Sequence, residues 1–435
     1  SGQPLGLDTL GHLSKVSYLK QYPSADWDMS WYSGTLFLKL YPPLFYYLSA
    51  IFPNPMLAAN FLSFLSIVLT SLGIYLLIKY KTRDEKISFV GGLSYLTVLS
   101  ISYYWIAVGN LPYFFALWTI PFSLYFLEKS IIEKRKKHFF LYSLIFTIGI
   151  LSHVVIGFLI GIFMITRFLF GGFNKNNLKR IFFYGLIPVL LSSFWFIPFL
   201  SYSNSSANYI GYIPTVSFLF GFDECCWGLQ AGGIGILFFL FIPLLLIFLF
   251  KKLWKNKFLS FVTFLLFILF FLLFGGLGNH YPFGVDPVRF ILPFSIFLAV
   301  FVSLVIKEFN FLKNNFFFAV ILIVILAGLI WNFSVIEENF EKYSYYKEDS
   351  RYKIMQEVIG NPSFPIKNEF TNYRFGTSRY VFGETINYFM PSVAQNFGYQ
   401  DVGMLNQREH FNLITFVWEK ENISESIYYL DWFGI

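Results

Sequence analysis

The sequence predicts an α-helical polytopic membrane protein with an external C-terminal region of mixed α/β structure. The chain of 435 residues is 56% hydrophobic and only 13% charged, a composition unlike that of soluble globular proteins of this size. Its hydrophobic residues form runs that reach the about 20 residues needed to cross a bilayer. Lys and Arg gather in short loops between these runs, as the positive-inside rule describes.

Composition also excludes several classes of protein. The net charge of +7 does not indicate a nucleic-acid partner, because the basic residues are concentrated in loops whose charge sets membrane orientation. The two cysteines are adjacent, Cys225 and Cys226, and they predict neither a disulfide framework nor a zinc site. The chain begins at Ser1 without a signal peptide, and we expect a further span to precede it.

The first clear span runs from Leu57 to Ile78. The basic residues of 79–86 follow it, so we expect that loop to be cytoplasmic and residues 1–56 to be external. This first segment is predicted to hold short amphipathic or juxtamembrane helices, including one that begins after the Pro42-Pro43 pair and lies along the membrane surface.

The next two apolar stretches are too long for single spans. Residues 87–128 would form a helix of about 63 Å, so we expect two spans that turn outside at Gly109–Pro112. Residues 139–173 would form one of about 52 Å. A hairpin that turns near Ser152 and His153 keeps the basic loops on both sides of this stretch in the cytoplasm.

Five further spans bring the expected total to about ten. They divide the chain into the external loop 1–56, the bundle 57–334 and the external region 335–435, which we expect to continue beyond Ile435. Three glycan-acceptor motifs, at Asn204, Asn332 and Asn422, fall on or at the edge of the predicted external side. The five spans are expected at about 182–200, 233–250, 258–275, 288–306 and 316–334.

The external loop 1–56 is the segment richest in candidate chemistry. It holds three carboxylates together with a histidine and many aromatic residues. The loop resembles the polytopic membrane proteins labelled 6-pyruvoyl-tetrahydropterin-synthase-related. The elements that carry the resemblance are Leu7-Asp8-Thr9-Leu10-Gly11-His12, Trp27, Trp31-Tyr32-Ser33-Gly34, Tyr41-Pro42-Pro43-Leu44 and, near a late span, Pro287-Val288-Arg289-Phe290.

Despite their label, these proteins are similar to the GT-C glycosyltransferases, which include oligosaccharyltransferases and protein mannosyltransferases. The resemblance therefore implies a GT-C-like bundle with a catalytic Asp in its first external loop, here Asp8. It also implies a sugar donor carried on a polyprenyl phosphate and a transfer at the outer membrane face. A carboxylate suits the base that such a transfer needs. Asp8 is equally suited to cap a helix over residues 9–19.

The other loop residues keep two interpretations each. Asp26 and Asp28 either position an acceptor, with or without a divalent metal such as Mg²⁺ or Mn²⁺, or belong to a solvated turn. Trp31 and Tyr32 either stack on a sugar or join the aromatic belt of the interface. His12 lies one helical turn after Asp8, where it binds substrate or is simply exposed.

Three positions outside this loop complete the candidate set. Arg289 either holds a lipid phosphate through paired hydrogen bonds or anchors the interface. His280 either donates to a phosphate or is an exposed loop residue. His153 is ionisable at membrane depth, but its position at a turn favours a structural role. Lys15 and Lys20 are expected to be solvated.

We therefore predict an integral membrane glycosyltransferase that moves a sugar from a polyprenyl-phosphate donor to an acceptor on the extracytoplasmic side. Asp8 is the expected base, and Arg289 is expected to hold the donor phosphate. Membrane lipids are the other expected partners. The alternative is a non-catalytic anchor whose external region assembles a cell-surface or envelope complex. A transporter is disfavoured, because the spans hold almost no charged or broken sites near their middle.

Overall fold

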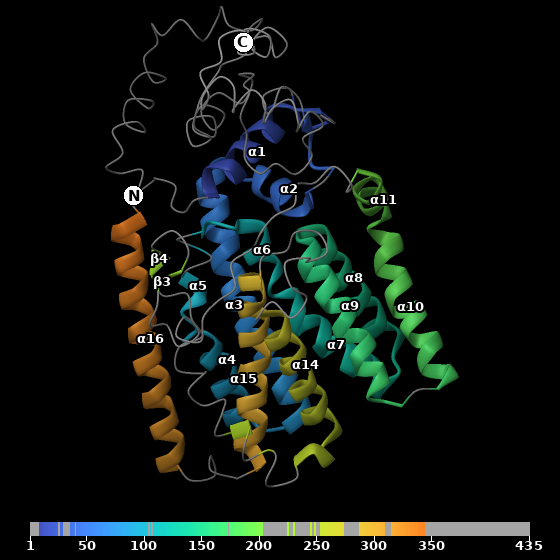
Figure 1. Ribbon diagram of the computed structural model, residues 1–435, viewed down its shortest axis with the longest axis vertical. Coiled ribbons are helices and arrows are strands. Elements are labelled where there is room, and N and C mark those ends of the chain that lie inside the picture. The colour runs from blue at the N-terminus through green and yellow to red at the C-terminus, as the bar shows by residue number, and fades with distance from the viewer. Residues whose placement is uncertain are drawn as a thin grey trace, which may run out of the picture.

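The computed structural model shows a bundle of long helices under a cap formed by two short helices, α1 and α2 (Figure 1). It describes residues 8–24, 27–28, 35–39, 41–102, 105, 108–172, 174–202, 224–225, 229–230, 244–245, 248, 253–273, 287–308 and 315–343. Residues 344–435, predicted to form mixed α/β structure, lie outside this set, so that prediction stays open. The predicted division into three domains is likewise not tested.

Almost all of the regular structure is helical. Two antiparallel strand pairs accompany the helices: β1 (Trp27–Asp28) with β2 (Thr35–Leu36), and β3 (Glu224–Cys225) with β4 (Leu229–Gln230). The helices are α1 (Thr9–Gln21), α2 (Leu44–Ala50), α3 (Pro55–Thr82), α4 (Glu85–Tyr95), α5 (Ser100–Ser102), α6 (Leu111–Ala116), α7 (Thr119–Glu133), α8 (Lys136–Ser152), α9 (Val154–Leu169), α10 (Lys175–Leu191), α11 (Ser193–Tyr202), η4 (Leu253–Lys255), α14 (Lys257–Leu273), η6 (Pro287–Phe290), α15 (Ile291–Glu308) and α16 (Asn315–Tyr343).

Local sequence signals set where several helices begin and end. The Asn54 side chain accepts hydrogen bonds from the first backbone N–H groups of α3, and Asp84 and Asn174 do the same for α4 and α10. Arg83 and Lys134 end α3 and α7 in the left-handed conformation, with φ of 55° and 54°. Short polar loops therefore separate the apolar helices.

Four helical segments of the described chain are long and apolar enough to cross a membrane: Pro55–Thr82, Leu111–Glu133, Ile291–Glu308 and Phe318–Val335. A fifth is added if α10 and α11 count as one broken span. The predicted hairpin at 139–173 is present, since Gly149 of α8 faces Ile160 of α9 and Gly161 faces Phe146. Its two limbs have 17 and 16 residues, short for a crossing. The count of ten spans stays a prediction.

The stretch 87–128 breaks at Gly109–Pro112 as predicted, but its first half is not one continuous span. Helix α4 ends at Tyr95, and Asn332 of α16 fills the gap by donating to the carbonyls of Leu96 (2.8 Å) and Val98 (3.3 Å). Asn332 is thus buried in the bundle, so its sequon gives no support for an external side.

The predicted straight span at about 182–200 is also corrected. Helices α10 and α11 meet at an angle of 86°, and the junction falls at Ser192. Pro188 lies one turn before it and removes an N–H from the helical ladder. The Ser192 hydroxyl donates to the Pro188 carbonyl at 2.9 Å and so stabilises the bend.

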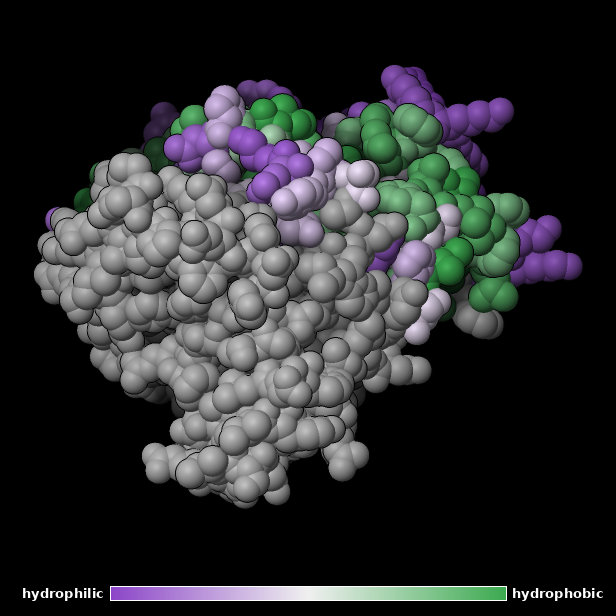
Figure 2. Space-filling view, turned by 90° about the horizontal axis from the view of Figure 1, so that it is seen from above, coloured by the Kyte–Doolittle hydropathy of each residue, from purple (hydrophilic) through white to green (hydrophobic). Residues whose placement is uncertain are grey.

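Helix α15 lies at the centre of the bundle, where its residues from Ile291 to Val305 are buried against α3, α4 and α14. Helices α10 and α11 lie at the margin. Figure 2 looks onto the cap end, and green hydrophobic residues dominate the described surface on the side where Figure 1 places these two helices. Exposed apolar residues such as Phe182 and Phe194 are typical of a lipid-facing surface.

The basic loops gather at the end of the bundle opposite the cap (Figure 1). Lys81 of α3 and Arg167 of α9 both pair with Glu128 of α7. Lys307, at the end of α15, donates to the carbonyl of Thr82 at 2.6 Å. Clustering of the cations at one end is what the positive-inside pattern requires.

Candidate active site

Asp8 lies where the cap meets the bundle. Its backbone N–H donates to the carbonyl of Val108 at 2.7 Å. The next residue, Gly109, has φ of +72°, and a Cβ there would come within 2.1 Å of the Thr9 hydroxyl. Only glycine allows this close approach, so the turn predicted at Gly109–Pro112 also positions the start of α1.

The Asp8 side chain does not cap α1, although the residue occupies the N-cap position. Its backbone carbonyl accepts the first helical bond, from His12 at 3.1 Å. The carboxylate lies close to Tyr46 of α2. Burial raises the pKa of the Tyr46 phenol, and the nearby Tyr41 and the negative charge of Asp8 raise it further. The negative charge of Asp8 therefore acts on a cluster of aromatic side chains.

His12 is fully buried, so the interpretation of an exposed loop histidine is wrong. Its Nδ1 lies 2.8 Å from the Tyr46 hydroxyl. Burial lowers the pKa of His12, and the positive charges of Lys15, His153 and Arg289 lower it further. His12 is therefore neutral near neutral pH.

The two cap lysines are less solvated than the sequence suggested. Lys15 is half-buried, with its ammonium 5.0 Å from the centre of the Tyr41 ring. Lys20 is exposed as expected, yet it donates to the carbonyls of Phe52 (2.9 Å) and Pro53 (2.6 Å). Lys20 thus ties α1 to the loop before α3, while Lys15 brings a positive charge to the cluster.

His153 separates α8 from α9 and is buried. Its ring lies 5.1 Å from that of Tyr113 and 6.2 Å from that of Tyr41. Its Nδ1 has no hydrogen-bond partner among the residues that the structure describes. An unsatisfied buried nitrogen is costly, so this atom is a candidate contact for a bound molecule.

Arg289 belongs to η6, immediately before the central helix α15. The Tyr113 hydroxyl donates to the backbone carbonyl of Arg289 and so fixes the main chain at the start of α15. The charge of Arg289 is close enough to influence His12. Two residues 281 positions apart in the sequence, Asp8 and Arg289, therefore lie at the same cluster of buried side chains.

We call these buried side chains the His–Tyr cluster: His12, Tyr41, Tyr46, Tyr113 and His153. Four separate parts of the chain supply it, and Asp8, Lys15 and Arg289 lie at its edges. Tyr41 and Tyr46 belong to the aromatic residues of 18–47, which the sequence offered either as a sugar platform or as an interfacial belt. Sequence reasoning missed Tyr113. The site combines one carboxylate and two basic side chains with several neutral donors and acceptors.

Several predicted site residues are not tested. Asp26, Trp31, Tyr32 and His280 lie outside the described residues, and Asp28 is described only through its backbone, in the extended strand β1. Within the described chain, no group of three His, Cys, Asp or Glu residues could hold a metal ion. Metal binding through Asp26 and Asp28 therefore stays a prediction.

A protein family described as the 6-pyruvoyl-tetrahydropterin synthase related domain, a membrane protein, matches residues 38–336. The chain belongs to this family. The matched region includes most of the His–Tyr cluster and Arg289, but it begins after Asp8 and His12. No curated protein matches the chain.

Comparison with solved structures shows that the chain has the GT-C membrane fold. The apo oligosaccharyltransferase of Archaeoglobus fulgidus is similar with a TM-score of 0.60 at 13% identity, over 99% of this chain and 65% of that one. Apo ArnT from Cupriavidus metallidurans is similar with a TM-score of 0.59 at 12% identity, over 96% of this chain and 87% of that one. The chain thus spans just under two thirds of the oligosaccharyltransferase.

The burial of His12 predicts that the protein loses stability in acid. The pKa of His12 in the folded state lies below its usual value of about 6.5, so below that pH the unfolded chain binds a proton that the folded chain excludes. The free energy of unfolding then falls by up to about 1.4 kcal/mol per pH unit.

Thermal unfolding in detergent between about pH 7.5 and pH 5.5 checks this. We expect the midpoint of the wild type to fall more steeply than that of His12→Gln. Other titrating groups contribute to both proteins and cancel in the difference. Parallel curves for the two proteins would show that His12 is not held neutral.

Proposed function

We propose that the protein is a glycosyltransferase that moves a sugar from a polyprenyl-phosphate donor to an acceptor at the extracytoplasmic membrane face. The observation that supports the proposal is that the charges of Asp8 and Arg289 both act on the His–Tyr cluster, on Tyr46 and His12 respectively. This cluster lies at the cap, at the end of the bundle remote from the basic loops (Figure 1). The GT-C fold supports the class of reaction.

Asp8 acts as the general base in this proposal. Its carboxylate takes the proton of an acceptor hydroxyl or amide, and the acceptor atom attacks the anomeric carbon of the sugar. The bond between that carbon and the phosphate oxygen breaks, and the polyprenyl phosphate leaves with the electron pair. The carboxylate is suited to this role because it is half-buried at the start of α1 and does not cap the helix.

Arg289 and Lys15 stabilise the negative charge of the departing phosphate. A guanidinium can hold two phosphate oxygens at once through charge-assisted hydrogen bonds. His153 adds a candidate contact through its unpaired Nδ1. His12 is neutral and lies next to the Tyr46 hydroxyl. It therefore adds no further charge between Asp8 and Arg289.

Transfer by the purified chain in lipid vesicles tests the proposal. A panel of synthetic polyprenyl-phosphate sugars is offered with hydroxyl and amide acceptors, and released polyprenyl phosphate is measured by mass spectrometry. Turnover of at least one donor is expected. If every donor stays intact while stable protein partners co-purify, the protein is instead a non-catalytic anchor for a surface complex.

Substitution of Arg289 by Gln is expected to lower kcat/KM for the donor by about ten- to a hundredfold, the range for losing a charge-assisted hydrogen bond. Arg289→Lys is expected to fall between Gln and the wild type, because it keeps the charge but loses the paired geometry. The backbone bond from Tyr113 is retained in both variants. Equal kcat/KM values in the three proteins would remove Arg289 from the donor site.

A further inference from the structure

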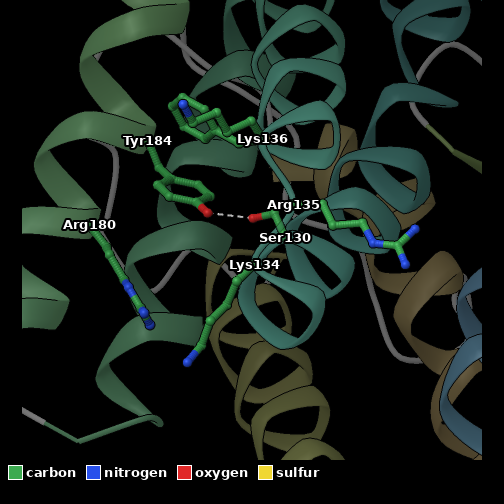
Figure 3. A pocket seen from close by; sticks show the side chains of 7 residues that line it. Ser130, Lys134, Arg135, Lys136, Arg180 and Tyr184 are labelled. Atoms are coloured by element: carbon green, nitrogen blue, oxygen red, sulfur yellow. Dashed lines mark hydrogen bonds between the residues drawn. The ribbon is translucent and has the colours of Figure 1, made fainter.

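A second polar site lies at the opposite end of the molecule from the His–Tyr cluster. It is a pocket of about 290 Å³ between the α7–α8 turn and the first half of α10. Figure 3 shows that its lining is rich in positive charge. The lining residues are Ser130, Lys134, Arg135, Lys136, Phe139, Arg180 and Tyr184, a set without any carboxylate.

Three of the four cations are available to a ligand. Arg135 extends away from the pocket in Figure 3, and its Nε lies 3.8 Å from Glu133. For Lys134, Lys136 and Arg180, no carboxylate of the described chain lies within 4.0 Å. Lys134 and Arg180 extend toward the same side of the pocket from different segments. An anion between them would offset their mutual repulsion.

Backbone geometry holds this arrangement in place. Lys134 ends α7 in the left-handed conformation, with φ of 54°. The next helix begins two residues later, at Lys136, whose side chain extends to the opposite side of the Tyr184 ring from Lys134 and Arg180 (Figure 3). Across the pocket, the hydroxyls of Ser130 and Tyr184 share a hydrogen bond that joins α7 to α10 (Figure 3). This pair offers polar contacts beneath the cations.

The pocket borders the apolar flank of the bundle. Phe140 of α8 and Phe183 of α10 are 63% and 53% exposed, and each lies one helical turn after a lining residue, Lys136 and Arg180 respectively. A phosphate in the pocket that carried acyl chains would place those chains beside these rings. Soluble phosphates would gain nothing from this apolar surface, so the surroundings favour a lipid.

We propose that this pocket binds the phosphate headgroup of an anionic membrane lipid, with Lys134 and Arg180 as its ligands and Lys136 as a further cation of the lining. The acyl chains lie against α8 and α10. Basic pockets between membrane helices on the cytoplasmic side are suited to such headgroups. The site is separate from the proposed transfer reaction and does not depend on it.

Direct binding to the full chain in neutral detergent tests the assignment. The probes are short-chain phosphatidic acid, phosphatidylcholine with the same chains, and inorganic phosphate, each titrated and followed by native mass spectrometry. The pocket variant carries Lys134→Asn, Lys136→Gln and Arg180→Gln. Asn is used at position 134 because it tolerates the left-handed conformation.

A matched control removes the same charge from the same loops. It carries Lys137→Gln, Lys175→Gln and Lys179→Gln, three exposed residues that do not line the pocket. We expect the affinities of the wild type and the control for phosphatidic acid to agree within about twofold. The affinity of the pocket variant is expected to be lower by about tenfold or more. If the pocket variant fails to fold, Arg180→Gln against Lys179→Gln makes the same comparison.

Two results would overturn the proposal. Equal binding of phosphatidic acid by the pocket and control variants would mean that general surface charge attracts the lipid. Binding of inorganic phosphate as tightly as phosphatidic acid would mean that acyl chains contribute nothing and that the ligand comes from solution. Weak binding of phosphatidylcholine to all proteins is expected, because its quaternary ammonium is repelled by the cations.

Discussion

Replacement of Asp8 by Asn is expected to lower the rate of sugar transfer by about 10²- to 10⁴-fold, the usual contribution of a general base. Asn has nearly the same shape but cannot accept the acceptor proton. The fold is expected to survive, because the substitution keeps the backbone bonds of Asp8 to Val108 and His12. The measurement is kcat for a polyprenyl-phosphate sugar in vesicles, with the thermal midpoint recorded beside it.

The matched control is Asp84→Asn. Asp84 occupies the N-cap of α4 and accepts a hydrogen bond from the Ile87 N–H at 3.1 Å. Asn caps helices as well as Asp does, so stability and activity are both expected to stay near those of the wild type. Wild-type activity in Asp8→Asn, with the control unchanged, would mean that Asp8 only begins α1 and that another group takes the proton.

The fold class could be predicted because the bilayer imposes simple rules of length and charge. The α8–α9 hairpin followed from an apolar run too long for one span, and its turn falls at His153 as expected. The rules fail where a helix is broken by contacts from elsewhere. Nothing near Tyr95 signals the end of α4, since the gap after it is filled by Asn332, more than 230 residues away.

The residues between Asp8 and Arg289 were harder to predict than these two. Asp8 and Arg289 were singled out before the structure, and their charges act on Tyr46 and His12 of one cluster, while their roles stay predictions. The burial of His12 could not be read from its neighbours, because it depends on how α2 folds back over α1. His153 was interpreted as structural because it lies at a turn, and its ring partners, Tyr41 and Tyr113, are distant in the sequence.

Glu128 shows the same limit at the other end of the bundle. Its side chain is 0% exposed and lies between Lys81 of α3 and Arg167 of α9, with Arg167 Nη2 3.2 Å from Glu128 Oε2. In sequence it is one acid near the end of an apolar run, like many that are solvated. Its role becomes visible only when three helices meet around it.

Substitution of Glu128 by Gln is expected to destabilise the protein by about 3–5 kcal/mol, because it leaves two largely buried cations without their shared counter-charge. The midpoint of thermal or denaturant unfolding in detergent measures this. Glu133→Gln is the control on the same helix. Glu133 is 25% exposed and contacts Lys129 at 3.8 Å, and Gln can keep its 2.9 Å hydrogen bond with His138 Nε2, so the substitution is expected to cost about 1 kcal/mol or less.

Glu128, Lys81 and Arg167 form a charged triad, and replacing all three by apolar residues separates the effect of charge from that of packing. The variant Glu128→Leu, Lys81→Met, Arg167→Met has no unpaired charge and is expected to regain most of the lost stability. Equal unfolding midpoints for Glu128→Gln and Glu133→Gln would show that the triad is solvated. Because α9 runs from His153 at the candidate site to Arg167 at the triad, loosening this end is also expected to disturb the position of His153 and to slow transfer.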